Sequence, residues 1–375
     1  MSVRIIRSVL SALIATGSIF LPTTTTQADR VRDDQWHLRY LRVNEAHKIT
    51  QGEGVTVAVI DTGVDPHPDL RRNLLPGIDI LPGGNGNGTE DQDSHGTSMA
   101  GLIAAHGQSQ HVGALGIAPK AKILPVYALP PGDIHGDADK IAEGIRWAIR
   151  NKATIINIST GGGSTQKLAR AIAEAISAEV VVIAAAGNAP GDFGVTFPAA
   201  LDGVVAVGAI DRSSNRSAVS ATGRELQLAA PGADIYSTSY RGKYSSGTGT
   251  SNATAIVAGA AALVRSKYPH LPAQEVIHRL TATAVDKGAP GRDEEYGYGV
   301  LDIVAALTAD VPPLGFESPG ASGATTPGTT ATATAIEPDG DGGPGWRLPL
   351  LTLGVLGLAG LTGLIWWRQR RHAAG

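Results

Sequence analysis

The chain has 375 residues, of which 42% are hydrophobic and 17% are charged. Its 31 Lys and Arg residues nearly balance 34 Asp and Glu residues, so the charge gives no electrostatic footprint for nucleic acid. The chain contains no cysteine, which excludes disulfides, thiolate metal sites and a cysteine nucleophile. Its 48 glycines and 22 prolines favour many tight turns and close helix-to-sheet contacts over a helical bundle.

Residues 1–28 have the order of a secretory signal peptide, in which two arginines precede an uncharged stretch over residues 9–21. That stretch is too short to span a bilayer comfortably, and an uncleaved N-terminal anchor is the alternative interpretation. Residues 29–49 are too few for a folded inhibitory prodomain. We expect them to form an N-terminal extension that wraps around the following domain.

Short β-branched runs alternate with helical runs between residues 50 and 309. Helices are expected at 99–105 and 138–151, and the predicted buried strands are 55–60, 123–127, 154–158, 180–184 and 204–207. Strands that alternate with helices indicate crossover connections. The pattern therefore predicts an α/β fold with a mostly parallel sheet and helices on both faces.

Polar residues whose side chains could take part in catalysis stand next to these elements. Asp61 and Asn188 follow the ends of two predicted strands, and His95 and Ser251 stand at the starts of helical runs. In parallel sheets, functional residues gather at the carboxyl ends of the strands. We therefore expect these side chains to lie close together.

Three of these side chains match the needs of nucleophilic catalysis. A serine hydroxyl such as that of Ser251 needs an adjacent base, and the imidazole of His95 has a suitable pKa range. A buried carboxylate such as Asp61 would hold the imidazole in the correct tautomer. The side-chain amide of Asn188, together with the backbone N–H of Ser251, would donate to a developing oxyanion.

Four separated segments carry these residues and resemble the four signature blocks of the subtilisin-like serine proteases. They are residues 58–64 (AVIDTGV), 94–101 (SHGTSMAG), 185–188 (AAGN) and 249–253 (GTSNA). The order Asp, His, Ser along the chain is also the order in subtilisin. The resemblance covers nearly all of residues 50–309. It implies a catalytic domain of three layers, with Asp61, His95 and Ser251 as the triad and Asn188 as the oxyanion donor.

The resemblance also implies a substrate-pairing edge, whose backbone adds the substrate peptide as an extra strand. The residues that match this edge are Ser159, Thr160, Gly161 and Gly162. The chain departs from the family at Ala255, where proline is usual, and at Asn252, where an apolar residue is usual. Ser98 is the alternative nucleophile, but choosing it would leave no histidine as its base.

No metal or nucleotide site is expected with this pattern. The other histidines lack the paired spacing of a zinc site, and the glycines after Thr160 lack the lysine of a phosphate-binding loop. Residues 83–93 include Glu90, Asp91 and Asp93, which could bind calcium as in some members of the family. A solvated loop without an ion is the favoured interpretation of that segment.

The C-terminal part differs in composition from the rest of the chain. Residues 310–345 are rich in Gly, Pro, Thr and Ala and predict a disordered linker. Residues 346–367 predict a transmembrane helix, because 348–367 carry no charge and tryptophans stand at both edges. A buried core helix is the alternative. The basic residues of 368–375 predict a cytoplasmic tail, with the catalytic domain outside the membrane.

These outer features, together with residues 35–38 (QWHL), resemble the mycosins, which are proteases associated with type VII secretion in actinobacteria. The resemblance implies a membrane-anchored extracytoplasmic serine endopeptidase that acts on protein or peptide substrates. Association with a type VII secretion complex is part of that expectation, and nucleic acid is not an expected partner. A largely non-catalytic structural role in a secretion complex is the alternative function.

Overall fold

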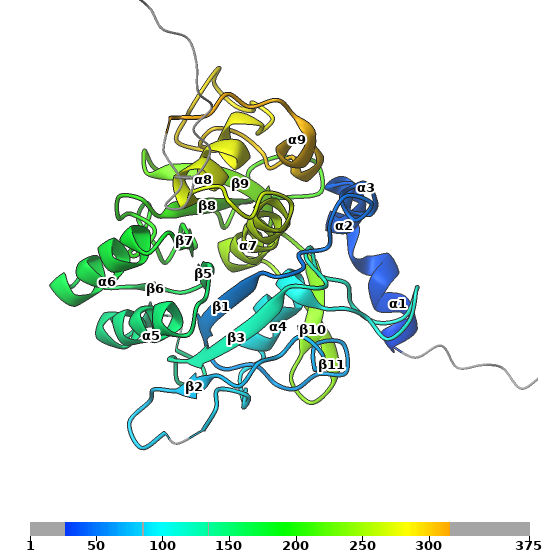
Figure 1. Cartoon of the computed structure of the whole chain (residues 1–375), viewed down its shortest axis with the longest axis vertical. Helices are drawn as coiled ribbons and strands as arrows, with labels where there is room; N and C mark the ends of the chain where they lie inside the picture. The colour runs from blue at the N-terminus through cyan, green and yellow to red at the C-terminus, as the bar shows by residue number, and fades with distance from the viewer. Residues whose placement is uncertain (1–26, 85, 134, 316–375) are drawn as a thin grey trace, which may run out of the picture. The chain divides into compact units, whose positions relative to one another are not determined.

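The computed structural model of the chain describes residues 27–84, 86–133 and 135–315 (Figure 1). The predicted membrane helix, the basic tail, most of the linker and nearly all of the signal peptide lie outside the described residues. Residues 27 and 28, at the end of the predicted signal peptide, begin helix α1 (Gln27–Asp34). No helix in the described ranges has the length and apolar character that a bilayer span requires.

A seven-stranded sheet forms the centre of the molecule, and all of its strand pairs are parallel. In spatial order the strands are β2 (Ile78–Asp79), β3 (Lys122–Tyr127), β1 (Thr56–Asp61), β5 (Ile155–Ile158), β7 (Val181–Ala185), β8 (Val205–Ile210) and β9 (Leu226–Pro231). This arrangement confirms the predicted α/β fold with a parallel sheet.

The five predicted strands are all present, and their ends differ from the predicted ones by at most three residues. Strands β2 and β9 were not predicted, nor was a separate antiparallel hairpin of β10 (Ile235–Ser239) and β11 (Lys243–Gly247). A third, two-residue pairing joins β4 (His135–Gly136) to β6 (Gly161–Gly162). Strands β2, β4 and β6 have only two residues each, and β10 and β11 are rich in polar residues, so these strands lack the continuous apolar run that marks a strand buried on both faces. Strand β9 is mostly apolar and buried, but its sequence, LQLAAP, contains none of the β-branched residues that favour strands.

Helices cover both faces of the sheet (Figure 1). One face packs against α4 (His95–Ala104), α7 (Thr250–Lys267), α8 (Ala273–Ala282) and α9 (Ile303–Thr308). The other face packs against α5 (Ala138–Arg150) and α6 (Gln166–Ser177). Along β5, Ile155 belongs to the first core and Ile156 to the second, as the alternation of side chains in a strand requires.

The N-terminal extension forms α1, α2 (Trp36–Tyr40) and α3 (Val43–Ala46), which lie beside β10, β11 and α9. The side chain of Gln35 donates to the carbonyls of Leu115 and Tyr236, and it accepts from the N–H of Leu115. The indole N–H of Trp36 donates to the carbonyl of Ala233. Contacts to segments far apart in the chain place this extension along the outside of the domain.

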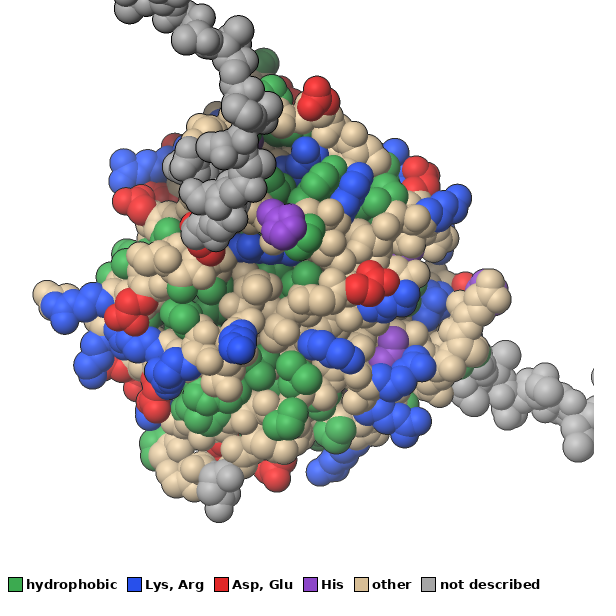
Figure 2. All heavy atoms as spheres, in the orientation of Figure 1, with side chains coloured by type: hydrophobic (Ala, Val, Ile, Leu, Met, Phe, Trp, Pro, Cys, Tyr) green, Lys and Arg blue, Asp and Glu red, His purple; other side chains and the backbone are tan. Residues whose placement is uncertain are grey.

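Charged side chains on the helical face opposite α7 pair with one another. Arg146 on α5 forms an ion pair with Glu174 on α6 at 2.7 Å, and Lys167 on α6 pairs with Asp139 on α5 at 2.7 Å. Figure 2 shows blue and red side chains adjoining at its left edge, where Figure 1 draws these helices. The pairs join two neighbouring helices at their exposed surfaces, where each contributes little to stability.

Candidate active site

Asp61 and His95 meet at the junction of β1 and α4. Asp61 is the last residue of β1, fully buried, and His95 is the first residue of α4. The distance between His95 Nδ1 and Asp61 Oδ1 is 2.7 Å. The backbones approach closely here, since a Cβ on Gly96 would lie 2.0 Å from the carbonyl oxygen of Gly63. Glycine at position 96 therefore lets the helix start directly against the end of the strand.

The imidazole of His95 lies in a field of carboxylates. Burial lowers its pKa, but the charge and hydrogen bond of Asp61, with smaller contributions from Asp93 and Asp91, outweigh burial and raise the pKa to about 8. About a third of the His95 side chain, 34%, remains exposed, and His95 lines a pocket that Asp61 does not reach. Asp61 Oδ1 also accepts the backbone N–H of Thr62 at 2.8 Å, which fixes the carboxylate.

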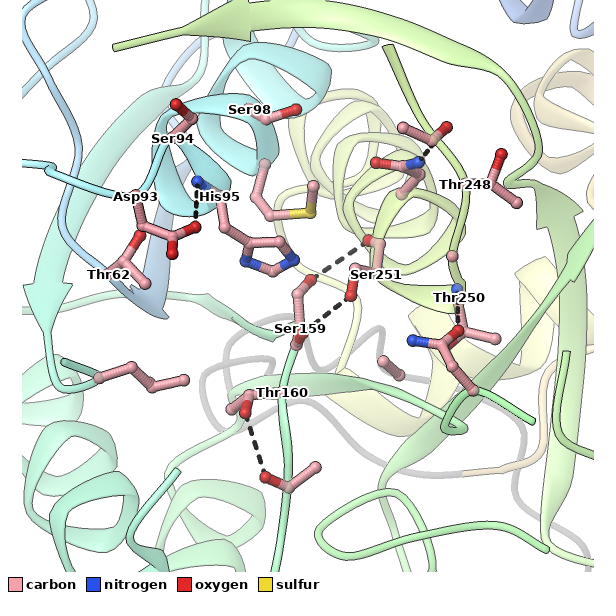
Figure 3. A pocket seen from close by; sticks show the side chains of 18 of the residues that line it. Thr62, Asp93, Ser94, His95, Ser98, Ser159, Thr160, Thr248, Thr250 and Ser251 are labelled. Atoms are coloured by element: carbon pink, nitrogen blue, oxygen red, sulfur yellow. Dashed lines mark hydrogen bonds between the residues drawn. The ribbon is translucent and has the colours of Figure 1, made fainter. Parts of the chain in front are cut away.

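Ser251 is the second residue of α7 and faces the same space as His95 (Figure 3). Its hydroxyl donates to the carbonyl oxygen of Ser159 at 2.9 Å. The hydroxyl of Ser159 in turn donates to the carbonyl oxygen of Ser251 at 3.2 Å. Figure 3 shows the His95 ring pointing toward this pair of serines. The start of α7 is thus tied to the end of β5 beside the imidazole.

Asn188 lies just beyond the end of β7, and its side-chain oxygen is engaged at the start of α7. Asn188 Oδ1 accepts the backbone N–H of Thr250 at 3.0 Å and its hydroxyl at 3.3 Å. An amide whose oxygen is bound in this way keeps its NH₂ group for another acceptor. The contact satisfies one of the free N–H groups at the helix start and orients the Asn188 amide.

One pocket of about 420 Å³ collects these groups. His95, Ser251 and Asn188 all line it, and Asp61 lies buried behind His95. Four residues from the ends of β1 and β7 and the starts of α4 and α7 therefore converge, as expected for the carboxyl ends of a parallel sheet. The alternative nucleophile Ser98 also lines this pocket, from the same helix as His95.

The predicted substrate-pairing edge is already partly paired with another strand of the protein. Ser159, Thr160 and Gly161 line the pocket, but Gly161 and Gly162 already pair with β4. The N–H of Gly162 also donates to the carbonyl of Phe197 at 2.9 Å. A peptide that adds a strand here must therefore use backbone groups that these pairings leave available, or displace β4.

Several residues support the site in ways that the sequence did not predict. Asp91 and Thr62 form hydrogen bonds around the start of α4, and Asn252 donates to the carbonyls of Gly232 and Gly247. The unusual polar residue after Ser251 thus fastens α7 to the end of β11. The position of Asp91 four residues before His95 was a signal, but only the fold shows what its carboxylate contacts.

The segment 83–93, considered above as a calcium site, is described except for residue 85. Across the described ranges, three or more His, Asp or Glu side chains nowhere converge as metal ligands would. Both oxygens of Asp91 accept hydrogen bonds from the protein. Calcium binding by residues 83–93 stays an untested alternative to the favoured interpretation, a solvated loop without an ion.

Comparisons with known proteins give the family. The model of the subtilase family, peptidase S8, matches residues 52–299. Subtilisin DY from Bacillus licheniformis is 40% identical over 263 residues, which cover 68% of this chain and 92% of that protein. The chain belongs to the subtilase family and is a serine endopeptidase.

Among solved structures, the chain is similar to members of one group of subtilases, the mycosins. MycP1 from Mycobacterium smegmatis is 30% identical, with a TM-score of 0.68 over 81% of this chain and 91% of that one. MycP3, a protease from the type VII (ESX-3) secretion system, is 34% identical, with a TM-score of 0.64 over 73% of this chain and 88% of that one. Both the sequence and the fold are thus similar to those of mycosins.

Proposed function

We propose that the chain hydrolyses peptide bonds through a triad of Asp61, His95 and Ser251, with Asn188 as the oxyanion donor. The observation that carries the proposal is the 2.7 Å contact between Asp61 and His95, in a pocket that also presents Ser251 and Asn188. The four residues come from four separate elements, so their convergence requires the whole domain to be folded.

The chemistry follows from these positions. The Ser251 hydroxyl leaves the Ser159 carbonyl and passes its proton to His95 Nε2 as its oxygen bonds to the substrate's carbonyl carbon. Asp61 accepts from Nδ1–H and stabilises the imidazolium. The oxyanion is bound by the Asn188 amide and the N–H of Ser251. His95 then protonates the leaving amine, and water hydrolyses the acyl-enzyme by the same route.

We further propose that the enzyme is anchored by residues 346–367, with its catalytic domain outside the membrane, its C-terminus cytoplasmic and its activity linked to type VII secretion. The uncharged run at 348–367 and the basic residues after it support the topology. The likeness to MycP3, from a type VII secretion system, supports the association.

Substitution of the proposed nucleophile tests the catalytic proposal. Ser251→Ala removes the only oxygen that bonds to the substrate, so peptide hydrolysis by the purified chain should fall to a small residual rate. Thermal unfolding of the variant, followed by circular dichroism, serves as the control for folding. Hydrolysis by Ser251→Ala at the parental rate would refute the triad.

A further inference from the structure

A buried carboxylate outside the triad, that of Asp91, lies beneath the turn before α4. Asp91 is 5% exposed. Its Oδ1 accepts from the Thr62 hydroxyl at 3.0 Å and from the backbone N–H groups of Asp93 and Ser94 at 2.9 Å each. Its Oδ2 accepts from the N–H of Thr97 at 2.9 Å and from the Thr97 hydroxyl at 2.5 Å. Five donors therefore converge on this one side chain.

The donors belong to the turn that delivers His95. Ser94 has a φ of 92°, which residues other than glycine rarely adopt, and its side chain makes no capping hydrogen bond to α4. The carboxylate of Asp91 binds the N–H groups on both sides of His95 in sequence, at Ser94 and Thr97. It thus supplies the acceptor that the helix start lacks and holds the strained residue in place.

A second path of hydrogen bonds joins Asp91 to Asp61. The Thr62 hydroxyl donates to Asp91 and accepts the N–H of Gly96 at 3.0 Å. The N–H of Thr62 donates to Asp61 Oδ1 at 2.8 Å. The end of β1 and the first turn of α4 are therefore fastened to one carboxylate, and these are the two segments that carry Asp61 and His95.

We infer that Asp91 is a positioning residue, which sets the His95 imidazole against Asp61 through the turn at Ser94 and through Thr62. The inference rests on the proposed triad. An amide at position 91 would turn an NH₂ group toward donors that now meet an oxygen, so Asp91→Asn should break the network while keeping the size of the side chain.

The test compares Asp91→Asn with Glu90→Gln, which removes the same charge one position earlier from an exposed side chain. Active sites are counted by labelling to completion with a fluorophosphonate, and kcat is expressed per labelled site. Asp91→Asn should lower kcat by about 10²-fold with a much smaller change in KM. A displacement of the reacting groups by about 1 Å lowers the reaction rate by about that factor. Glu90→Gln should keep the parental kcat.

A parental kcat per labelled site in Asp91→Asn, with only the yield of folded protein reduced, would overturn the inference. If Asp91→Asn does not fold, Thr62→Ser and Thr62→Val replace it, because serine keeps the bridging hydroxyl and valine removes it. Thr62→Ser should retain kcat and Thr62→Val should lose it, and equal values would also overturn the inference. Ser251→Ala is measured alongside, since its activity alone reports on the triad.

Discussion

At the scale of single residues, Asp61 determines the pH range in which His95, the proposed base, is neutral. Asp61 binds the imidazole at 2.7 Å and raises the pKa of His95 to about 8 against the effect of burial. Only the neutral ring can take a proton from Ser251. The raised pKa therefore stabilises the fold at pH values below the ordinary range of histidine, and this contribution is lost as the pH rises through about 8.

Activity should increase over the pH range in which this stabilisation of the fold is lost. We predict that kcat/KM for a neutral peptide increases with pH and reaches half of its plateau near pH 8, where His95 loses its proton. A pH-rate profile of the purified enzyme measures this midpoint. A midpoint at or below about 6.5, the value of an unperturbed histidine, would contradict the assigned influence of Asp61.

Asn188 is predicted to act through its NH₂ group, since its oxygen already binds Thr250. Asn188→Asp keeps an acceptor for the Thr250 N–H and removes the donor to the oxyanion. Its kcat should fall by about 10²- to 10³-fold, with KM and the unfolding temperature much less affected. Steady-state kinetics and calorimetry measure both quantities. An Asn188→Asp variant with parental kcat would exclude Asn188 as the oxyanion donor.

The sequence alone predicted that these residues lie close together, because Asp61 and Asn188 follow recognisable strands and His95 and Ser251 stand at the starts of helical runs. It did not predict that the Ser251 hydroxyl rests on the Ser159 carbonyl, or that Asp91 organises the turn at Ser94. The first contact joins segments that are far apart in the chain. The second joins residues only three apart, but it depends on the left-handed turn at Ser94, which no apolar pattern marks.

At the scale of elements, helix α4, which begins at His95, packs closely against strand β10. The hydroxyls of Ser237 and Thr238 on β10 donate to the carbonyls of Ser98 and Thr97, both at 2.8 Å. A Cβ on Gly101 would lie 2.1 Å from Thr238 Oγ1. Glycine at position 101 therefore permits the contact between the helix and the hairpin.

Gly101→Val should force α4 and β10 apart and lower the free energy of unfolding by about 1–3 kcal/mol, the usual cost of overpacking. Urea unfolding measures this change. Gly163→Ala is the matched control, because a Cβ at Gly163 meets nothing within 4 Å. Equal destabilisation of the two variants would show that the space at Gly101 is not limiting.

Element prediction succeeded where burial produced a simple pattern. Strands β7 and β8 are buried along their whole length and are continuous runs without a polar side chain. The start of α4 was placed four residues late, at Met99, because its first turn is polar and its capping acceptor, Asp91, precedes the helix by several residues. Caps supplied from a distance cannot be found from periodicity.

At the scale of the whole molecule, the N-terminal extension joins parts of the domain that are distant in sequence. Trp36 is 5% exposed and its indole N–H donates to the carbonyl of Ala233 at 3.1 Å. Arg42, in the turn before α3, binds both carboxylate oxygens of Asp302 at 2.7 Å. The extension thus contacts the segment before β10 and the start of α9, so it belongs to the folded unit.

Trp36→Ala should therefore destabilise the entire domain and not only the extension. A loss of about 3–5 kcal/mol is expected for removing a buried tryptophan. Chemical unfolding followed by two probes, intrinsic fluorescence and proteolysis of the catalytic domain, measures it. Arg39→Ala, at an exposed position of the same helix, is the control. Unfolding of the domain at the parental midpoint in Trp36→Ala would contradict this role.

The central claim is that one hydroxyl, that of Ser251, is made nucleophilic by His95. Labelling of the purified chain with a fluorophosphonate, followed by peptide mapping, tests it most directly. We expect one labelled residue, Ser251, and loss of labelling in His95→Ala. Labelling at Ser98 instead, or undiminished labelling in His95→Ala, would contradict it.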